Sequence, residues 1–113
     1  MKEKRLTKLE AEFYNNIRQI LKQMEKEKVK ADYLHETILE YVVDWEMVMK
    51  NKPIEARAHF SVFMLLFFDH PVFFNNIRHK CEKIDKSCQK LFKCYKKLSK
   101  AYKEACGVDY NEC

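Results

Sequence analysis

The sequence predicts an all-α protein, a small helical bundle of about four helices with a long C-terminal helix carrying a heptad seam. Two observations support this prediction. The 113 residues include only one glycine, Gly107, and two prolines, Pro53 and Pro71, so turns are few and helices are long. Apolar residues recur at spacings of three and four along most of the chain, which is the helical period. The length fits one domain over residues 1–113.

The first two helices are predicted over about residues 6–28 and 33–51. The apolar residues of the first recur at spacings of three and four: Leu6, Leu9, Phe13, Ile17, Ile20 and Met24. The polar run EKEKVKAD ends this helix. The second begins after Asp32, a good N-cap residue, and places Leu34, Ile38 and Trp45 on one face. Each helix therefore has one stripe to bury.

The third helix is predicted over residues 53–69, because Pro53 suits the first helical position. From Phe60 to Phe68 it is apolar nearly all round, as expected for a helix that its neighbours surround, and His59 is expected to be a core histidine. Asp69 and Pro71 repeat the start signal. The fourth helix is therefore predicted over residues 71–106, with Gly107 as its C-cap and 107–113 as a short tail.

The fourth helix carries the sharpest pattern, a row of residues spaced alternately by four and three. This predicted seam consists of Ile77, Cys81, Ile84, Cys88, Leu91, Tyr95, Leu98 and Tyr102. At 1.5 Å per residue the helix would be roughly 50 Å long, about twice its neighbours. We therefore expect it to project beyond its own bundle and to bury its seam against a protein partner or a second copy. Phe92, Cys94 and Ala101 widen the apolar stripe, so its second half should pack on more than one helix.

The five cysteines form no metal-binding pattern. Cys81 and Cys88 are seven residues apart, roughly 10 Å along a helix, whereas sulfurs sharing one zinc lie within about 4 Å of each other. Their odd number favours free thiols in the cytoplasm or another reducing compartment. A disulfide remains open between Cys106 and Cys113, or between copies across a parallel seam. No metal or cofactor is expected.

The net charge of +5 lies entirely in the last third of the chain. Residues 1–70 contain 12 basic and 12 acidic residues, and residues 71–113 contain 10 and 5. Six of these lysines share a predicted solvent face: Lys83, Lys86, Lys90, Lys93, Lys97 and Lys100. Such a face attracts phosphate or an acidic partner. Carboxylates recur every fourth residue in the second helix, at Asp32, Glu36, Glu40 and Asp44.

Phenylalanines gather around the junction of the third and fourth helices. They are Phe60, Phe63, Phe67, Phe73 and Phe74. They can be core residues, the lining of a small-ligand pocket or an exposed patch that docks a partner.

The pattern favours a non-enzymatic helical interaction module, an adaptor, regulator or assembly subunit that acts through helix–helix contacts and homodimerisation. The four histidines form no catalytic arrangement, and a phosphate-binding glycine loop is excluded. One alternative is electrostatic nucleic-acid binding through the lysine face, although base readout favours arginine and amide side chains. Another is a bundle that binds a small ligand or metal. A membrane span is not expected, because the longest uncharged run is too short.

Overall fold

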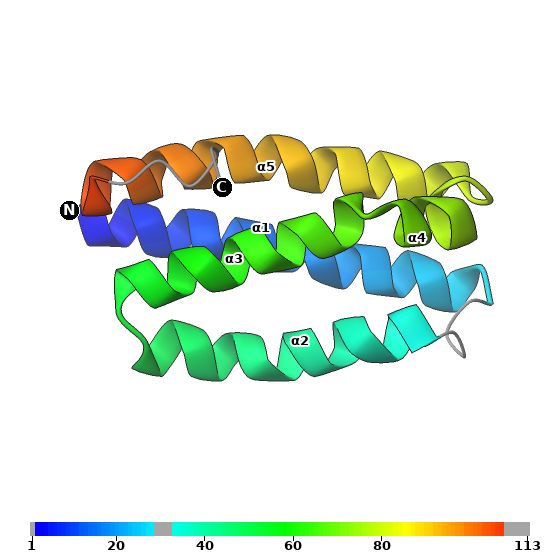
Figure 1. The fold of residues 1–113 in the computed structure, drawn as a ribbon, viewed down its shortest axis with the longest axis horizontal. Helices are drawn as coiled ribbons and strands as arrows, with labels where there is room; N and C mark the ends of the chain where they lie inside the picture. Colours follow the sequence, from blue (N-terminus) through cyan, green and yellow to red (C-terminus); the bar gives the residue numbers. More distant parts are fainter. Residues whose placement is uncertain (1, 29–32, 108–113) are drawn as a thin grey trace.

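A computed structural model describes residues 2–28 and 33–107, and it confirms the predicted all-α bundle. The four long helices are α1 (Lys2–Lys26), α2 (Tyr33–Asn51), α3 (Ile54–Asp69) and α5 (Glu82–Cys106). They run alternately up and down the bundle (Figure 1). Between α3 and α5 lie the short helix α4 (Pro71–Phe73) and the π-helical turn η1 (Phe74–Arg78).

The most extensive packing is between α1 and α5, which run antiparallel and side by side (Figure 1). Each has 25 residues, about 37 Å at the helical rise. The predicted stripe of α1 is buried from Leu6 to Met24, and α3 packs on α5 as well, which confirms that α5 meets more than one helix. The observed α1 begins four residues earlier than predicted, since the charged residues before Leu6 are good helix formers.

The prediction of one continuous helix over residues 71–106 is wrong. The chain bends by only 43° at Pro71, between α3 and the Pro71–Arg78 segment. It reverses later, around Cys81, which is extended with φ −135° and ψ 108°. In η1 the amide of His79 donates to the carbonyl of Phe74 at 2.7 Å, the wider turn of a π-helix. Because α5 begins only at Glu82, it matches α1 in length and does not project beyond the bundle.

Arg78 stabilises this reversal. Its guanidinium donates to Oδ1 of Asp85 at 2.7 Å and lies 3.9 Å from the carboxylate of Asp69. The same group stacks over the rings of Phe74 and Phe92, with 5.4 Å and 5.0 Å to their centroids. A guanidinium can bind carboxylates and stack on aromatic rings at the same time. A continuous heptad pattern does not predict such contacts.

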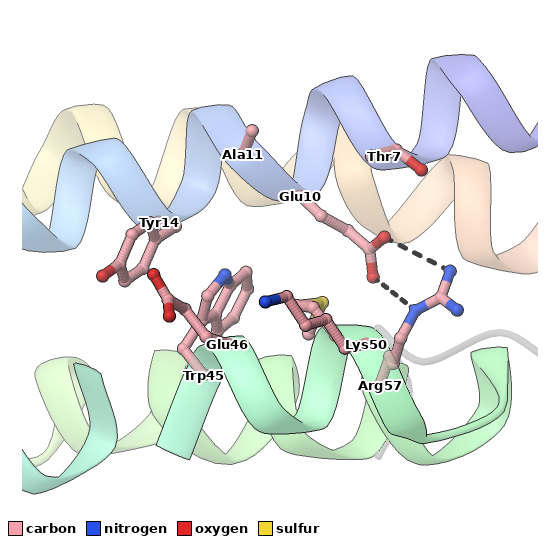
Figure 2. A pocket seen from close by; sticks show the side chains of 9 residues that line it. Thr7, Glu10, Ala11, Tyr14, Trp45, Glu46, Lys50 and Arg57 are labelled. Atoms are coloured by element: carbon pink, nitrogen blue, oxygen red, sulfur yellow. Dashed lines mark hydrogen bonds and ion pairs between the residues drawn. The ribbon is translucent and has the colours of Figure 1, made fainter. Parts of the chain in front are cut away.

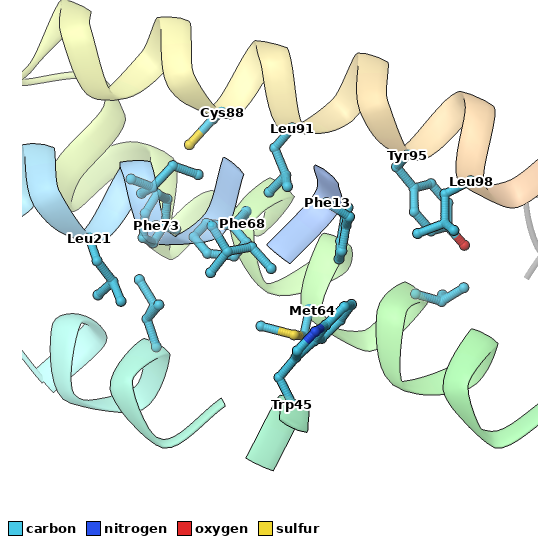
Figure 3. Packing of buried hydrophobic residues seen from close by; sticks show 14 of the residues in the cluster. Phe13, Leu21, Trp45, Met64, Phe68, Phe73, Cys88, Leu91, Tyr95 and Leu98 are labelled. Carbon is cyan, nitrogen blue, oxygen red and sulfur yellow. The ribbon is translucent and has the colours of Figure 1, made fainter. Parts of the chain in front are cut away.

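The core is rich in aromatic contacts. The Phe13 ring lies 5.7 Å from the rings of both Trp45 and Tyr95, so α1, α2 and α5 meet there (Figure 3). Gly107 ends α5 in the left-handed conformation, φ 73°, which confirms the predicted C-cap. Pro53 was predicted at the first helical position of α3 and instead occupies the N-cap, one position earlier in the helix.

Candidate functional site

The predicted seam lies inside the chain's own core. Its α5 members Ile84, Cys88, Leu91, Tyr95, Leu98 and Tyr102 are all buried against α1 and α3 (Figure 3). Ile77, in η1, is also buried, and Cys81, the N-cap of α5, is half-buried. The burial pattern was therefore predicted correctly. Because the α5 members are buried within this chain, a partner could reach them only if the bundle opened, and the expectation that the seam binds a partner stays a prediction.

The lysine face is exposed as predicted at all six positions from Lys83 to Lys100. Lys86 forms an ion pair with Glu82 at 3.2 Å. A groove of about 370 Å³ lies between this face and α1, and Figure 1 shows the two helices side by side along their length. Its lining residues are Glu12, Asn15, Asn16, Lys90, Lys93, Cys94 and Lys97.

The seam cysteines carry free thiols. Burial raises the pKa of Cys88 from 9.0 to about 12, so its thiol stays protonated and unreactive at neutral pH. Because Cys88 is fully buried within one chain, a disulfide across a dimer seam would require the bundle to open. Burial likewise raises the pKa of the half-buried Cys94. The pairing of Cys106 with Cys113, which the sequence left open, involves a residue outside the described ranges, Cys113.

An apolar row runs along the side of α2 that faces away from the bundle. Leu39, Val43 and Met47 recur every fourth residue and are 41%, 74% and 65% exposed. The carboxylates of Glu36, Glu40 and Asp44 are exposed beside them, whereas Asp32 lies outside the described residues. We call these six described residues the α2 outer face. Exposed apolar side chains in a row, rimmed by charge, are typical of a docking surface.

The phenylalanine cluster divides between core and surface. Phe73 is buried and Phe60 and Phe67 are half-buried, but Phe63 and Phe74 are 55% and 41% exposed. The expectation that neighbouring helices surround the apolar third helix on all sides is therefore wrong. The ring of Tyr41 meets those of Phe60, Phe63 and Phe67 edge-on, which ties α2 to α3. Phe67 and Phe73 also line a groove of about 270 Å³ with Tyr33, Leu34, His70 and Val72.

The histidines are spread over the molecule. His59, predicted in the core, is exposed, because it points outward from α3. Nδ1 of His70 accepts the amide of Val72 at 3.2 Å and caps α4. His35 is buried, with Nε2 3.7 Å from a carboxylate oxygen of Glu25. Among the described residues, no three histidine, cysteine or acidic side chains are grouped so that they could ligate a metal.

A buried polar network that the sequence patterns did not predict joins α1, α3 and α5. Glu10 is 4% exposed, and its carboxylate accepts from Nε and Nη2 of Arg57 at 3.0 and 3.3 Å. It also accepts from the hydroxyl of Tyr102 at 2.8 Å, which lies 3.1 Å from Ser61. Burial, and then the charge of Glu10, raise the pKa of Tyr102. Glu10 lies on the apolar stripe of α1, four residues after Leu6. A carboxylate at this position was the one feature of the sequence that indicated a buried polar network.

A pocket of about 340 Å³ opens above this network, between α1, α2 and α3 (Figure 2). Its lining residues are Thr7, Glu10, Ala11, Tyr14, Trp45, Glu46, Met49, Lys50 and Arg57. The Glu10–Arg57 ion pair lies at one end, and Tyr14, Trp45 and Glu46 lie at the other (Figure 2). The rings of Tyr14 and Trp45 stack at 5.5 Å with an interplanar angle of 7°.

Within residues 2–28 and 33–107, none of the helices is by itself long and apolar enough to cross a membrane. Helix α3 and the Pro71–Arg78 segment reach the necessary length and composition only when taken together, across their 43° bend.

The chain matches no model of a known protein family, no curated protein and no solved structure. Its function must therefore be inferred from its own surfaces and pockets.

Proposed function

We propose that this protein is a non-enzymatic helical interaction module that binds a basic amphipathic helix of a protein partner on the α2 outer face. One observation carries the proposal: Leu39, Val43 and Met47 form an exposed apolar row within an acidic surround. The heptad seam of α5 closes the bundle internally, so the exposed row on α2 is the better docking surface.

The charge of α2 defines the complementary partner. Residues Tyr33–Asn51 contain four acidic side chains and one lysine, a charge of −3, although the whole chain carries +5. A partner helix with an apolar row flanked by lysine or arginine would match both features. Burying the exposed parts of the three apolar side chains contributes roughly 3–5 kcal/mol. Association costs about 4–15 kcal/mol, so flanking ion pairs are needed and binding should depend on salt.

A second copy of this chain fits the α2 outer face poorly. The strongly basic surface lies on α5, on the far side of the bundle from α2 (Figure 1). That surface offers lysines without large exposed apolar residues, so Leu39, Val43 and Met47 would face only charge. A contact between α2 and α5 of successive copies would also be heterologous and would extend without closing. A basic helix of another protein satisfies the charge and the apolar row together.

The test uses two designed helical peptides with the same apolar row, one flanked by lysines and one by glutamates. Their affinities are measured by fluorescence anisotropy at low and high salt. We expect the lysine peptide to bind more tightly, with an affinity that falls as salt is added. Val43→Asp should weaken binding at least tenfold, since the 74% exposed side chain lies in the middle of the row.

Leu66→Asp on α3 is the matched control. Leu66 is 53% exposed and lies outside the α2 outer face, so its replacement should leave peptide binding unchanged. Charge reversal by Glu36→Lys, Glu40→Lys and Asp44→Lys should exchange the preference between the two peptides. Equal binding of both peptides, or a normal affinity of Val43→Asp with its helical circular dichroism intact, would refute the proposal.

The groove between α1 and α5 supports a second candidate function, binding of nucleic acid through the phosphate backbone. Lys90, Lys93 and Lys97 line one wall, and the amides of Asn15 and Asn16 line the other together with the carboxylate of Glu12. Lysines at this spacing contact phosphates without reading sequence. Affinity for single-stranded or duplex oligonucleotides should fall steeply with salt and be lost on replacing Lys93, Lys97 and Lys100 with Glu. Absence of binding at low salt would exclude this function.

A further inference from the structure

We infer that the pocket between α1, α2 and α3 binds a small aromatic carboxylate. This goes beyond the proposed function, because the pocket faces the inside of the α1–α2 junction and the α2 outer face points away from it. It also differs in kind from a peptide surface. The pocket combines a rigid aromatic wall with a cation and a neutralised ion pair, and each part has a role in recognising such a ligand (Figure 2).

The wall of the pocket suits one aromatic ring. Trp45 is 4% exposed and is fixed by the rings of Phe13, Tyr14 and Phe60 at 5.7, 5.5 and 6.0 Å, so the surface it presents is preformed. Met49 and Ala11 complete the apolar lining. A volume of about 340 Å³ is near the lower limit of small-molecule sites, which favours a ligand of a single ring with short substituents.

The polar end of the pocket selects an anion. Glu10 is already neutralised, because its carboxylate accepts three hydrogen bonds from Arg57 and Tyr102. Arg57 has five N–H donors, of which two serve Glu10 and one, on Nη1, donates to the carbonyl of Lys52 at 3.5 Å, so two remain for a ligand. Lys50 is exposed, lines the same cavity and has no ion-pair partner within the described residues. A ligand carboxylate between Lys50 and Arg57 gains charge-assisted hydrogen bonds, whereas an ammonium group would meet two cations.

The opposite end favours a hydrogen-bond donor on the ring. Glu46 precedes Lys50 by one helical turn, roughly 6 Å along the axis, which is comparable to the span of one substituted ring. Figure 2 places Glu46 beside Tyr14, away from the Glu10–Arg57 ion pair. Its carboxylate would accept from a hydroxyl at the far end of the ligand. Hydroxylated aromatic acids should therefore bind more tightly than the unsubstituted acids.

The lone tryptophan of the chain, Trp45, reports on the pocket directly. The experiment titrates the full-length protein with 4-hydroxyphenylacetate, phenylacetate and phenylacetamide, measuring Trp45 fluorescence and amide chemical shifts by NMR. We expect saturable binding in that order of decreasing affinity. The shifts should be largest around Tyr14, Trp45 and Lys50. The amide tests the carboxylate, since it has the same ring and nearly the same shape without the charge.

Two variants locate the ligand. Lys50→Gln should weaken phenylacetate binding about tenfold by removing a charge-assisted hydrogen bond, while Lys52→Gln, an exposed lysine outside the lining, should have no effect. Ala11→Leu should fill the cavity and abolish binding, with circular dichroism confirming the fold. Peptide binding on the α2 outer face should remain normal in all three variants, so the two proposals fail separately.

Three results would overturn the inference. The first is absence of saturation at millimolar ligand, and the second is phenylacetamide binding as tightly as phenylacetate. The third is a normal affinity of Lys50→Gln, an exposed position whose replacement does not threaten folding.

Discussion

The buried ion pair between Glu10 and Arg57 gives the sharpest prediction about stability. Its side chains are only 5% and 16% exposed, so water screens the charges little. The substitution Arg57→Met keeps most of the side-chain volume and removes the guanidinium. Glu10 then keeps its bond from Tyr102 but has no opposite charge beside it. Breaking one side of a buried pair costs about 3–5 kcal/mol.

We expect Arg57→Met to lower the free energy of unfolding by about 3 kcal/mol, at the lower end of that range, because the hydroxyl of Tyr102 still donates to Glu10. The double variant Glu10→Leu with Arg57→Met should be within about 1 kcal/mol of the native chain, because an apolar pair of similar volume carries no desolvation penalty. The hydroxyl of Tyr102 would still have Ser61, 3.1 Å away, as its partner.

The assay is urea unfolding followed by far-ultraviolet circular dichroism, with the m value compared among the native chain, both single variants and the double variant. Glu10→Leu should cost less than Arg57→Met, because Arg57 can reach water through the pocket whereas Glu10 is buried. The reasoning is refuted if the two single effects simply add in the double variant, or if Arg57→Met costs less than about 1 kcal/mol.

Three further predictions concern the core, the reversal and the buried thiol. Leu91→Ala should cost about 2–5 kcal/mol in urea unfolding, and Leu39→Ala, which is 41% exposed, less than about 1 kcal/mol; similar losses would contradict the internal placement of the seam. Arg78→Met should cost about 1.5–3 kcal/mol by removing the bond to Asp85, and should speed amide hydrogen exchange in residues 74–82; unchanged exchange would mean that other contacts hold the reversal. Folding raises the pKa of Cys88 from 9.0 to about 12, because the buried site favours the protonated thiol. The contribution of this thiol to the stability of the fold is therefore complete below pH 9 and is lost as the pH rises toward 12. The free energy of unfolding should therefore fall above pH 9 by up to about 1.4 kcal/mol per pH unit. In Cys88→Ala the fall should be shallower, with a residual slope from Tyr102, whose pKa is also raised. Equal slopes in the two proteins would show that the thiol does not contribute.

The apolar spacing predicted which faces are buried better than it predicted where the chain reverses. The bounds of α2 agree with the prediction at both ends, and the stripes of α1 and α5 are both in the core. The reversal was misplaced because Pro71, the obvious breaker, sits where only a bend occurs. At Cys81 the break depends on the contacts of Arg78 with Asp85 and two aromatic rings, none of which has a local sequence signal.

The pocket could not be predicted from spacing, because its parts come from three helices. Glu10, Trp45 and Arg57 are far apart in the sequence, and only the packing of α2 and α3 against α1 brings them together. Glu10 nevertheless carried a signal, a carboxylate on an apolar stripe that must find a partner if it is buried. The exposed row on α2 also has a helical spacing, but spacing alone does not distinguish a row that faces water from one that faces the core.

The reversal at Cys81 also explains why the seam needs no second chain. A continuous helix of residues 71–106 would carry more seam than any other helix of the chain could cover, and the excess would require a partner. With α5 shortened to 25 residues, α1 provides a stripe on a helix of equal length, and α3 covers the remaining side. A heptad pattern shows that a face is buried, and the lengths of the other stripes then decide whether the same chain can bury it. An exposed apolar row remains on α2, beside carboxylates whose charge is opposite to that of the α5 lysines, and this is why we propose that the partner binds there.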